Sequence, residues 1–425
     1  MRCTSSWAAI ATGLVAAGLV AGAPCASSDV KPIRQIELGP RPYFLVNNMT
    51  AGPLKDKLAG CSDMDVKPSA WSIGHRGGAP LQFPEHSREA NLAGARMGAG
   101  TIECDVSFTK DRQLVCRHSQ CDLHTTTNIV AIEELNAKCT KPFEAAGDGK
   151  AASAMCCTSD VTLAEFKSLC AKMDGFNASA TTAHDFLGGT PNWRTDLYAT
   201  CGTLLDHHEH IALIEGLGLA HSPELKAPSV PMPFDGNYTL EAYRRQMIDN
   251  YIAAGVPASR VRPQSFSPDD VRFWLAEYPD YGNQSMLLDE TEPEEEAVRR
   301  LEGFARDGIR TMAPPMQYLV HEAKGGGDGG NKMEASEYAR RARELGLGLI
   351  TWSLERSGPL AAVRANGDYY YANVRDVVTK DGDMYEYVDV LWNEVGVEGL
   401  FSDWSATATF YANCMGVGEG GSEGP

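Results

Sequence analysis

The chain has 425 residues, of which 43% are hydrophobic and 22% charged, and its formal net charge is −18 at pH 7. This composition is ordinary for a globular protein, and the length allows one large domain or two of average size. The negative charge argues against sequence-independent nucleic-acid binding, which needs a basic surface to displace counterions.

Residues 1–26 are typical of a secretory signal peptide. Arg2 supplies a positive charge, an apolar stretch runs from Trp7 to Ala23, and small residues follow it. A membrane anchor is the alternative, but the stretch is shorter than the roughly 20 apolar residues that a span needs. We therefore expect a secreted protein with no stable membrane span, cleaved between Gly22 and Ala26.

The cysteine count agrees with this expectation. Of twelve cysteines, Cys3 and Cys25 would leave with the signal peptide, and the remaining ten are compatible with five disulfides. Eight of the ten lie between Cys104 and Cys201, so we expect local disulfides there. A zinc site at Cys156-Cys157 is disfavoured because adjacent cysteines lack the usual CxxC spacing. Four N-x-S/T sequons are candidate glycan sites: Asn48, Asn177, Asn237 and Asn283.

Residues 27–70 are expected to form an irregular leader, and strands alternate with helices from Trp71 onward. Eight short apolar runs are candidate strands: Trp71–His75, Thr101–Val106, Pro223–Lys226, Val261–Phe266, Asn283–Leu288, Ile309–Ala313, Leu349–Ser353 and Val397–Ser402. Amphipathic stretches separate most of them: Glu85–Met97, Leu240–Ala254, Asp269–Glu277, Glu292–Arg306 and Met333–Leu345. Eight strands with intervening helices predict a (β/α)8 barrel, in which catalytic residues lie at the C-terminal strand ends.

The alternation is interrupted once, after the second strand. Lys110–Leu114 is expected to form a hairpin turn, and the chain then returns through Val115–His118. We expect residues 119–201 to form a cysteine-rich insertion over the barrel mouth, with one helix at Leu163–Leu169. The barrel domain would span 71–414, and residues 415–425, rich in Gly and Glu, would form a flexible tail.

Two strands carry acidic residues in the pattern of a metal site. Glu103 and Asp105 share one face of the second strand, and Cys104 points to the other face. Two adjacent carboxylates need a cation or a shared proton, and oxygen ligands favour Mg²⁺ or Ca²⁺ over zinc. Glu224 can add a third carboxylate, and Lys226 can neutralise a phosphate oxygen. Surface acids and a salt bridge across the barrel mouth are the structural alternatives.

Two histidines near strand ends are candidates for proton transfer. Cleavage of a phosphodiester needs one group to accept a proton and another to donate one, and His75 and His118 titrate in the right range. Arg76 offers a planar fork for a phosphate. Glu85 opens the first helix, where it is either a first-turn acid or a further metal ligand.

Asp206–His210 contains three histidines and two acids and looks like a metal cluster. His207 and His210 are three residues apart and could share a ligand. The segment lies on an expected amphipathic helix, so we interpret it as a solvated helix face.

Together these motifs resemble the glycerophosphodiester phosphodiesterase family, and above all its longer periplasmic and secreted fungal-type members. The resemblance covers roughly residues 71–405 and keeps the order of the family's motifs, which is specific although each motif alone is weak. The matching segments are Gly74–Gly77, Pro84–Ser87, Glu103–Val106, Thr109–Asp111, Leu114–His118, Pro223–Lys226, Gln264–Phe266, Thr351–Ser353 and Gly399–Asp403.

The resemblance implies a (β/α)8 barrel with an insertion after the second strand and one divalent cation, Ca²⁺ or Mg²⁺. The residues that it implies are Glu103, Asp105 and Glu224 on the cation, His75 and His118 as acid and base, Arg76 and Lys226 near the phosphate, and Trp352 lining the substrate site. In the family's reaction the glycerol 2-hydroxyl attacks phosphorus, and the cyclic phosphate is then hydrolysed. The products are glycerol 3-phosphate and an alcohol such as choline.

The sequence departs from the family's pattern at three positions. His86 and Ser87 stand where Asn and Thr are usual, and Ser119 stands where an acidic residue often follows the second histidine. These changes spare every expected ligand and proton carrier, but they alter the groups around His118 and the first helix.

We therefore expect a secreted, metal-dependent phosphoric diester hydrolase whose partner is a small glycerophosphodiester. An enzyme of the sphingomyelinase D or phospholipase D type on the same barrel is the first alternative, and Pro223–Lys226 argues against it. A non-catalytic secreted binding protein is the second, and it would be expected to lack a ligand. The oligomeric state stays open.

Overall fold

The computed structural model describes residues 30–196, 198–323, 333–365, 367 and 369–418. Its centre is a closed barrel of eight parallel strands, which are, in chain order, β1 (Ser69–Gly74), β2 (Ala99–Phe108), β8 (Ala220–Leu225), β9 (Gln264–Ser265), β10 (Met286–Leu288), β11 (Thr311–Ala313), β14 (Gly348–Leu354) and β15 (Gly399–Ser402). The barrel closes because β1 pairs with both β2 and β15. The expected (β/α)8 barrel is confirmed, and each of the eight expected runs contains or overlaps a strand.

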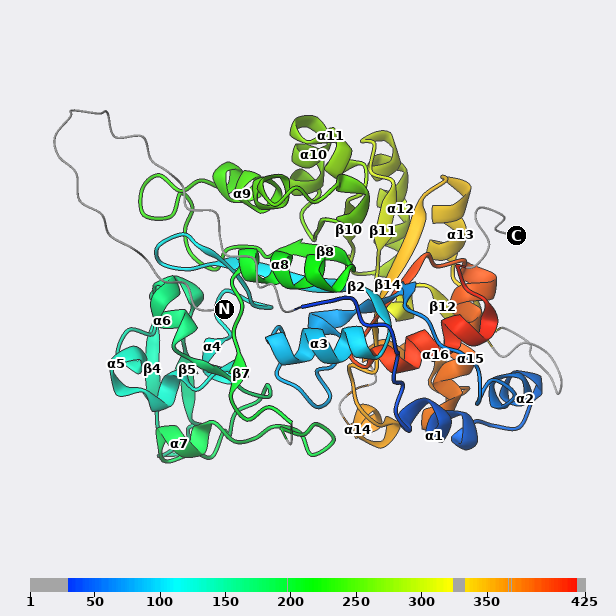
Figure 1. Cartoon of the computed structure of the whole chain (residues 1–425), viewed down its shortest axis with the longest axis horizontal. Coiled ribbons are helices and arrows are strands. Elements are labelled where there is room, and N and C mark those ends of the chain that lie inside the picture. The colour runs from blue at the N-terminus through cyan, green and yellow to red at the C-terminus, as the bar shows by residue number, and fades with distance from the viewer. Residues whose placement is uncertain (1–29, 197, 324–332, 366, 368, 419–425) are drawn as a thin grey trace, which may run out of the picture.

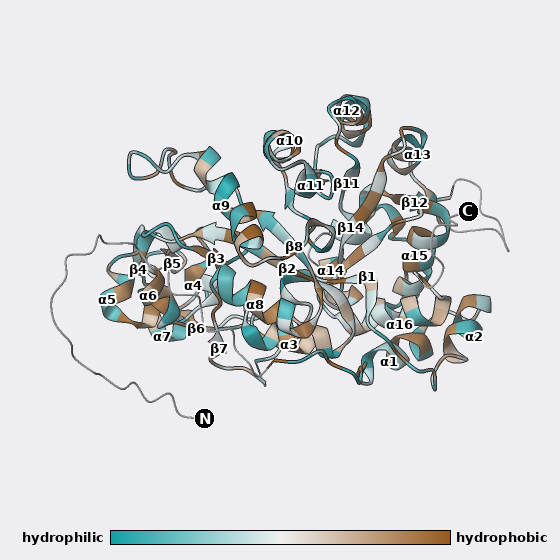
Figure 2. Ribbon diagram, turned by 45° about the horizontal axis from the view of Figure 1, so that its top comes forward, coloured by the Kyte–Doolittle hydropathy of each residue, from teal (hydrophilic) through white to brown (hydrophobic). Residues whose placement is uncertain are grey.

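Helices surround this barrel (Figure 1). Those that follow its strands are α3 (Arg88–Arg96), α8 (His207–Leu217), α9 (Leu240–Ala253), α10 (Pro268–Glu277), α12 (Glu294–Arg306), α13 (Glu337–Glu344), α14 (Leu360–Ala365), α15 (Met384–Val390) and α16 (Ser405–Met415). The outer helices α12 and α13 are largely hydrophilic, whereas β14 beneath them is largely hydrophobic (Figure 2). Burial of the apolar side chains between strands and helices gives the barrel its main core.

The expected helix Met333–Leu345 begins later than the sequence pattern indicates. Met333–Ala335 is a strand, β13, which pairs with β12 (Val320–Glu322). The helix starts only after Ser336, whose hydroxyl accepts a hydrogen bond from the backbone N–H of Ala339. The capping serine therefore decides the boundary.

The expectation of an irregular leader was wrong in part. Residues 30–70 include the helices α1 (Arg41–Asn48) and α2 (Pro53–Ala59), and their side chains Leu45 and Leu58 are fully buried. A disulfide between Cys61 and Cys414 joins this segment to α16. These short helices gain their stability from packing on the barrel rather than from their own sequence.

The cysteine-rich insertion follows the expected hairpin, since β3 (Leu114–Cys116) pairs with β2 in antiparallel fashion. It contains four helices rather than the expected one: α4 (Leu123–Thr126), α5 (Glu133–Asn136), α6 (Leu163–Lys167) and α7 (Ala183–Phe186). Helices of four or five residues are too short to show an amphipathic period. The insertion also contains β4 (Lys141–Glu144), β5 (Ser153–Met155) and β6 (Cys170–Ala171) around its own small core, and β6 pairs with β7 (Gly202–Thr203), which directly follows the insertion.

The expected five disulfides are present: Cys61–Cys414, Cys104–Cys116, Cys121–Cys157, Cys139–Cys156 and Cys170–Cys201. No helix within the described ranges is long and apolar enough to cross a membrane. The predicted signal peptide and most of the predicted tail lie outside the described residues.

Candidate active site

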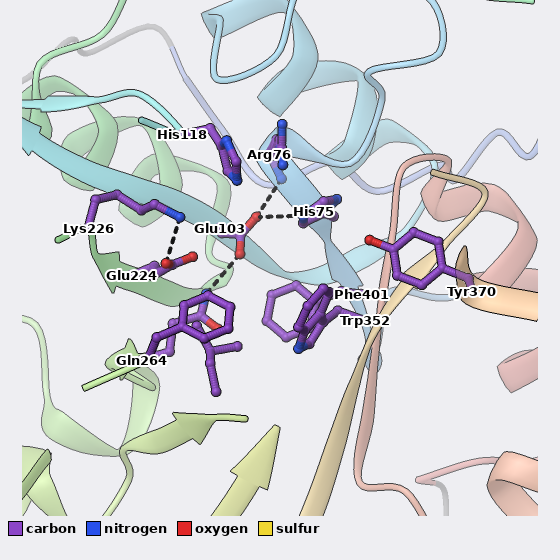
Figure 3. A pocket seen from close by; sticks show the side chains of 12 residues that line it. His75, Arg76, Glu103, His118, Glu224, Lys226, Gln264, Trp352, Tyr370 and Phe401 are labelled. Carbon is purple, nitrogen blue, oxygen red and sulfur yellow. Dashed lines mark hydrogen bonds and ion pairs between the residues drawn. The ribbon is translucent and has the colours of Figure 1, made fainter. Parts of the chain in front are cut away.

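A pocket of about 380 Å³ opens at the C-terminal ends of the barrel strands (Figure 3). Its lining residues are His75, Arg76, Glu103, His118, Glu224, Lys226, Gln264, Phe266, Leu288, Trp352, Tyr370 and Phe401. Seven of the nine candidate site residues from the sequence line this pocket. The other two, Asp105 and Glu85, are buried and are not among the lining residues.

Neighbouring strands bring three carboxylates together. Glu103 and Asp105 lie on β2, and the register of β2 with β8 sets Asp105 beside Glu224. One carboxylate oxygen from each lies within 4.8 Å of the other two. Cys104 points the other way, as strand alternation requires, and forms a disulfide with Cys116.

Hydrogen bonds hold this carboxylate group in place. Glu103 accepts from the backbone N–H of Arg76 (2.7 Å) and from Nε2 of Gln264 (2.8 Å). Nζ of Lys226 lies 2.7 Å from Oε1 of Glu224. Gln264 belongs to Gln264–Phe266, one of the segments that match the family, but nothing in the sequence indicated its contact with Glu103.

Burial and mutual repulsion oppose ionisation of the three acids together. Burial and the charges of Asp105 and Glu224 raise the pKa of Glu103, and burial and Asp105 raise the pKa of Glu224. Burial also opposes ionisation of Asp105, but Lys226 and His86 outweigh it and hold the pKa of Asp105 well below its usual range. The group thus needs positive charge to be fully ionised.

The donor set fits a hard divalent cation. All three side chains are buried and offer oxygen atoms, and Oδ1 of Asp105 is a buried acceptor with no hydrogen-bond partner among the described residues. Carboxylate oxygens are the ligands that Mg²⁺ and Ca²⁺ prefer. Glu85 lies outside this group: Oε2 of Glu85 pairs with Nη1 of Arg76 at 3.0 Å. In this structure Glu85 therefore forms an ion pair with an arginine.

A tight turn at the end of β1 presents His75 to the pocket. The turn η1 (His75–Gly77) leads into Gly78, which has φ 85° and leaves no room for a side chain, because a Cβ there would lie 2.3 Å from Oγ of Ser405. Nε2 of His75 lies 3.8 Å from Oε2 of Glu103. Burial lowers the pKa of His75 to about 4, although Asp403 opposes this effect. The imidazole is therefore neutral near pH 7.

Asp403 is the main site residue that the sequence reasoning missed. Its Oδ1 lies 2.5 Å from Nδ1 of His75, and the two residues are 328 positions apart. Its Oδ2 accepts from Nη2 of Arg194 (2.9 Å) and from Nη1 of Arg356 (3.1 Å). Burial raises the pKa of Asp403, but Arg356 and His75 outweigh it and lower the pKa. The position of Asp403 directly after the eighth strand was the available signal.

His118 reaches the pocket because β3 runs back along β2. The backbone N–H of Arg117 donates to the carbonyl of Asp105 (2.7 Å), so the hairpin continues up to the residue before His118. Burial, Arg76 and Lys226 all lower the pKa of His118. His118 thus lies near two cations that would also attract a phosphate, and an anionic phosphate bound there would offset their effect on the pKa of His118.

His86 contacts the carboxylate group directly. Its Nε2 lies 2.8 Å from Oδ2 of Asp105, and its backbone has φ 55°. The sequence showed His86 as a departure from the family's asparagine but did not show this contact.

Aromatic side chains form the opposite wall (Figure 3). The ring of Trp352 lies 5.9 Å from that of Phe266 and 6.1 Å from that of Tyr370, both edge to face. Its Nε1 donates to the carbonyl of Ala313 (2.8 Å), which fixes the indole. The pocket thus has a charged side and an aromatic side.

The interpretation of Asp206–His210 as a solvated face was wrong for two residues. His207 and His210 are buried, and Nδ1 of His207 lies 3.0 Å from Nδ2 of Asn250. A ring nitrogen of His210 lies close to the sulfurs of Cys104 and Cys116, but these form a disulfide and offer no thiolate to a metal. Only His208 and Glu209 are exposed, as expected.

A (β/α)8 barrel whose mouth combines two histidines, an arginine, a lysine and three carboxylates defines a barrel enzyme suited to phosphate esters. Residues 75–407 match the model of the glycerophosphoryl diester phosphodiesterase family, and the chain belongs to this family. It is therefore a phosphoric diester hydrolase by class. The expected family membership is confirmed.

The chain is also similar to one other protein and to two solved structures. The chain is 48% identical over 250 residues to an "Extracellular protein" of Arthroderma benhamiae, which covers 58% of this chain and 100% of that protein. A structure described as a glycerophosphoryl diester phosphodiesterase from Silicibacter pomeroyi has a TM-score of 0.50 and 17% identity, covering 85% of this chain and 98% of the other. An Oleispira antarctica phosphodiesterase in complex with the product sn-glycerol-3-phosphate has a TM-score of 0.44 and 15% identity, covering 80% and 95%. The Silicibacter structure shares the fold.

Proposed function

We propose that this protein is a secreted, cation-dependent enzyme that cleaves glycerophosphodiesters to glycerol 3-phosphate and an alcohol. The observation that carries the proposal is the shared pocket of His75, His118 and the carboxylate group at the strand ends. Family membership supports the reaction type. The substrate, the cation and the roles of individual residues are the proposed parts.

We assign the first proton transfer to His75. Asp403 accepts the hydrogen bond from Nδ1, so Nε2 carries the lone pair and faces the pocket, beside Glu103. Nε2 takes the proton from the glycerol 2-hydroxyl as that oxygen bonds to phosphorus. The bond from phosphorus to the alcohol oxygen then breaks, and protonated His118 gives its proton to the departing oxygen.

Hydrolysis of the cyclic phosphate reverses these roles. His118 takes a proton from water as the water oxygen bonds to phosphorus, and His75 returns its proton to the glycerol 2-oxygen as the ring opens. Both histidines end in their starting protonation states, so the cycle balances. An anionic phosphate bound beside Arg76 and Lys226 offsets their charge, so the substrate complex favours the protonated His118 from which this cycle starts.

Positive side chains hold the phosphate. Arg76 and Lys226 lie on the same side of the pocket as His118 (Figure 3), and they stabilise the extra negative charge on the phosphate oxygens as bonds form and break. The aromatic wall containing Trp352 and Phe266 excludes water from the other side of the substrate.

Glu103, Asp105 and Glu224 would hold one divalent cation, Ca²⁺ or Mg²⁺. Such a cation would polarise a phosphate oxygen and a glycerol hydroxyl. The fit rests on the three buried carboxylates and on Oδ1 of Asp105, for which the described residues offer no hydrogen-bond partner.

Secretion is supported from two directions. The relative from Arthroderma benhamiae is named an extracellular protein, and five disulfides suit an oxidising compartment. The proposed signal peptide, residues 1–26, agrees with both. Asn237 and Asn283 are exposed, which fits their proposed use as glycan sites.

A coupled assay tests the proposed function. We expect the purified protein to release glycerol 3-phosphate from glycerophosphocholine, and we expect a chelator or Glu103→Gln to abolish the release. Activity that survives both would contradict cation dependence. Preferred cleavage of a lysolipid or a sphingolipid would instead indicate an enzyme of the phospholipase D type.

A further inference from the structure

The cysteine-rich insertion reaches the partner of His75 through one arginine. Arg194 lies on the segment between α7 and β7, which extends from the insertion toward the barrel (Figure 1). Its side chain is only 5% exposed. Its Nη2 lies 2.9 Å from Oδ2 of Asp403 and 3.3 Å from the carbonyl oxygen of Arg356.

Packing on both sides of Arg194 fixes this segment to barrel loops. The ring of Trp193 lies against Gly358, where a Cβ would come within 2.5 Å of the indole. The backbone N–H of Thr195 donates to the carbonyl of Leu81 (3.0 Å). Four residues later in the chain than Arg194, Tyr198 stacks on Phe83 with ring centroids 5.4 Å apart. The backbone around Arg194 is therefore fixed by its neighbours and not by the ion pair of Arg194 alone.

The second arginine at Asp403 is shared with other acids. Nη1 of Arg356 lies 3.1 Å from Oδ2 of Asp403 but also 3.4 Å from Oε2 of Glu85, and its Nη2 lies 3.9 Å from Asp174. Within the described parts of the chain, the side chain of Arg194 forms an ion pair with a single carboxylate, that of Asp403. Since a buried carboxylate needs a full set of donors, Arg194 completes the hydrogen bonding of Asp403.

We propose that Arg194 is a positioning residue for the reaction and acts through Asp403 on the imidazole of His75. The insertion thus contributes a residue to the active site. This inference rests on the proposed function. One carboxylate oxygen holds Nδ1–H of His75, and Arg194 fixes the other oxygen of the same group. Loss of Arg194 lets the carboxylate rotate, and Nε2 of His75 then no longer points steadily at the substrate.

Kinetics of Arg194→Met, Arg194→Lys and Asp403→Asn test this chain of contacts. We expect Arg194→Met to lower kcat for glycerophosphocholine by about 10- to 100-fold, with KM changed by less than about twofold. Arg194→Lys should restore part of the loss. Because Arg194 acts through Asp403, adding Arg194→Met to Asp403→Asn should cause no further loss.

Lys138→Met is the matched control, because Lys138 is an insertion cation that pairs with Glu165 on the insertion surface. We expect its kcat to equal that of the wild type. Thermal unfolding of each variant separates loss of folded protein from loss of turnover. An Arg194→Met protein with a lower Tm but unchanged kcat, or with an effect that adds to that of Asp403→Asn, would overturn the inference.

Nitrogen-15 labelling of the histidines gives a readout that needs no turnover. The Nδ1-bound proton of His75 should give a downfield signal that disappears in Asp403→Asn, shifts or broadens in Arg194→Met, and stays unchanged in Lys138→Met. If Arg194→Met leaves the signal of this His75 proton unchanged, the inference is contradicted. This outcome holds whether or not the wild type cleaves a glycerophosphodiester. Absence of cleavage with the expected signals would contradict the proposed function alone.

Discussion

Nε2 of His86 lies 2.8 Å from Oδ2 of Asp105, so a histidine fixes one member of the carboxylate group. The family that this chain resembles usually has an asparagine at this position. Both side chains are almost completely buried, and Oδ1 of Asp105 has no hydrogen-bond partner in the part of the chain that the structure describes. A side chain that orients a metal ligand by a hydrogen bond contributes to metal affinity without contacting the metal.

We expect His86→Ala to weaken divalent-cation binding by about 10- to 100-fold, because Asp105 loses the donor that orients it. His86→Asn, which restores the family's residue and a side-chain donor, should retain most of the affinity. Isothermal titration calorimetry with Ca²⁺ and Mg²⁺ measures the effect. His208→Ala removes an exposed histidine of α8 and serves as the control; equal affinities for His86→Ala and this control would contradict the role of His86.

Cation binding should stabilise the protein more at high pH than at low pH. The raised pKa values of Glu103 and Glu224 mean that the cation-free folded state loses stability as pH rises from the ordinary carboxyl pKa of about 4.3 through the raised values. A cation removes this penalty, and a hundredfold excess over Kd adds about 2.7 kcal/mol. We expect a larger cation-induced rise in Tm near pH 8 than near pH 5, with Glu103→Gln reducing it. A rise that does not grow with pH would show that the acids are not the binding group.

The disulfide between Cys104 and Cys116 should support the site as well as the fold. It joins β2, which carries Glu103 and Asp105, to β3, which leads to His118. Replacement of both cysteines by alanine should cost about 3 kcal/mol of unfolding free energy and also weaken cation binding.

The disulfide Cys139–Cys156 provides a matched comparison for that experiment. It spans 17 residues, against 12 for Cys104–Cys116, and lies within the insertion. Its removal should lower stability by a similar amount but leave cation affinity unchanged. Denaturant unfolding measures the stability of the two double variants, and calorimetry measures their cation affinity. Equal cation affinity in the two variants would show that the β2–β3 disulfide has no part in the site.

Buried neutral histidines should make the protein sensitive to acid. Burial lowers the pKa of His207 to about 3, so its contribution to stability is complete above the unfolded pKa of about 6.5 and is lost as pH falls below it. The free energy of unfolding should fall by about 1.4 kcal/mol per pH unit for each such histidine. His207→Gln can still accept a hydrogen bond from Asn250. This variant should reduce the slope of the unfolding free energy against pH by the contribution of one histidine. His208→Gln, next to it but exposed, should leave the slope unchanged, and identical slopes for the two variants would refute the explanation.

The barrel and most of the pocket could be predicted from the sequence because their signals are local. An apolar run marks each strand, and a polar side chain at its end reaches the barrel mouth wherever the neighbouring strands lie. Alternation along β2 likewise separates Glu103 and Asp105 from Cys104 before any contact is known. The hairpin that brings His118 beside these acids also has a local signal, in the turn at Lys110–Leu114.

The remaining relationships depend on closure of the barrel and on packing of the insertion. Asp403 meets His75 only because β15 pairs with β1, and Arg194 meets Asp403 only because its segment is packed against barrel loops. His207 and His210 are buried because α8 packs against the barrel, although their sequence suggests a solvated face. By itself, then, the sequence determined which residues end the strands. Contacts between side chains far apart in the chain were decided by the tertiary structure, because they follow from how the elements pack and not from any local pattern.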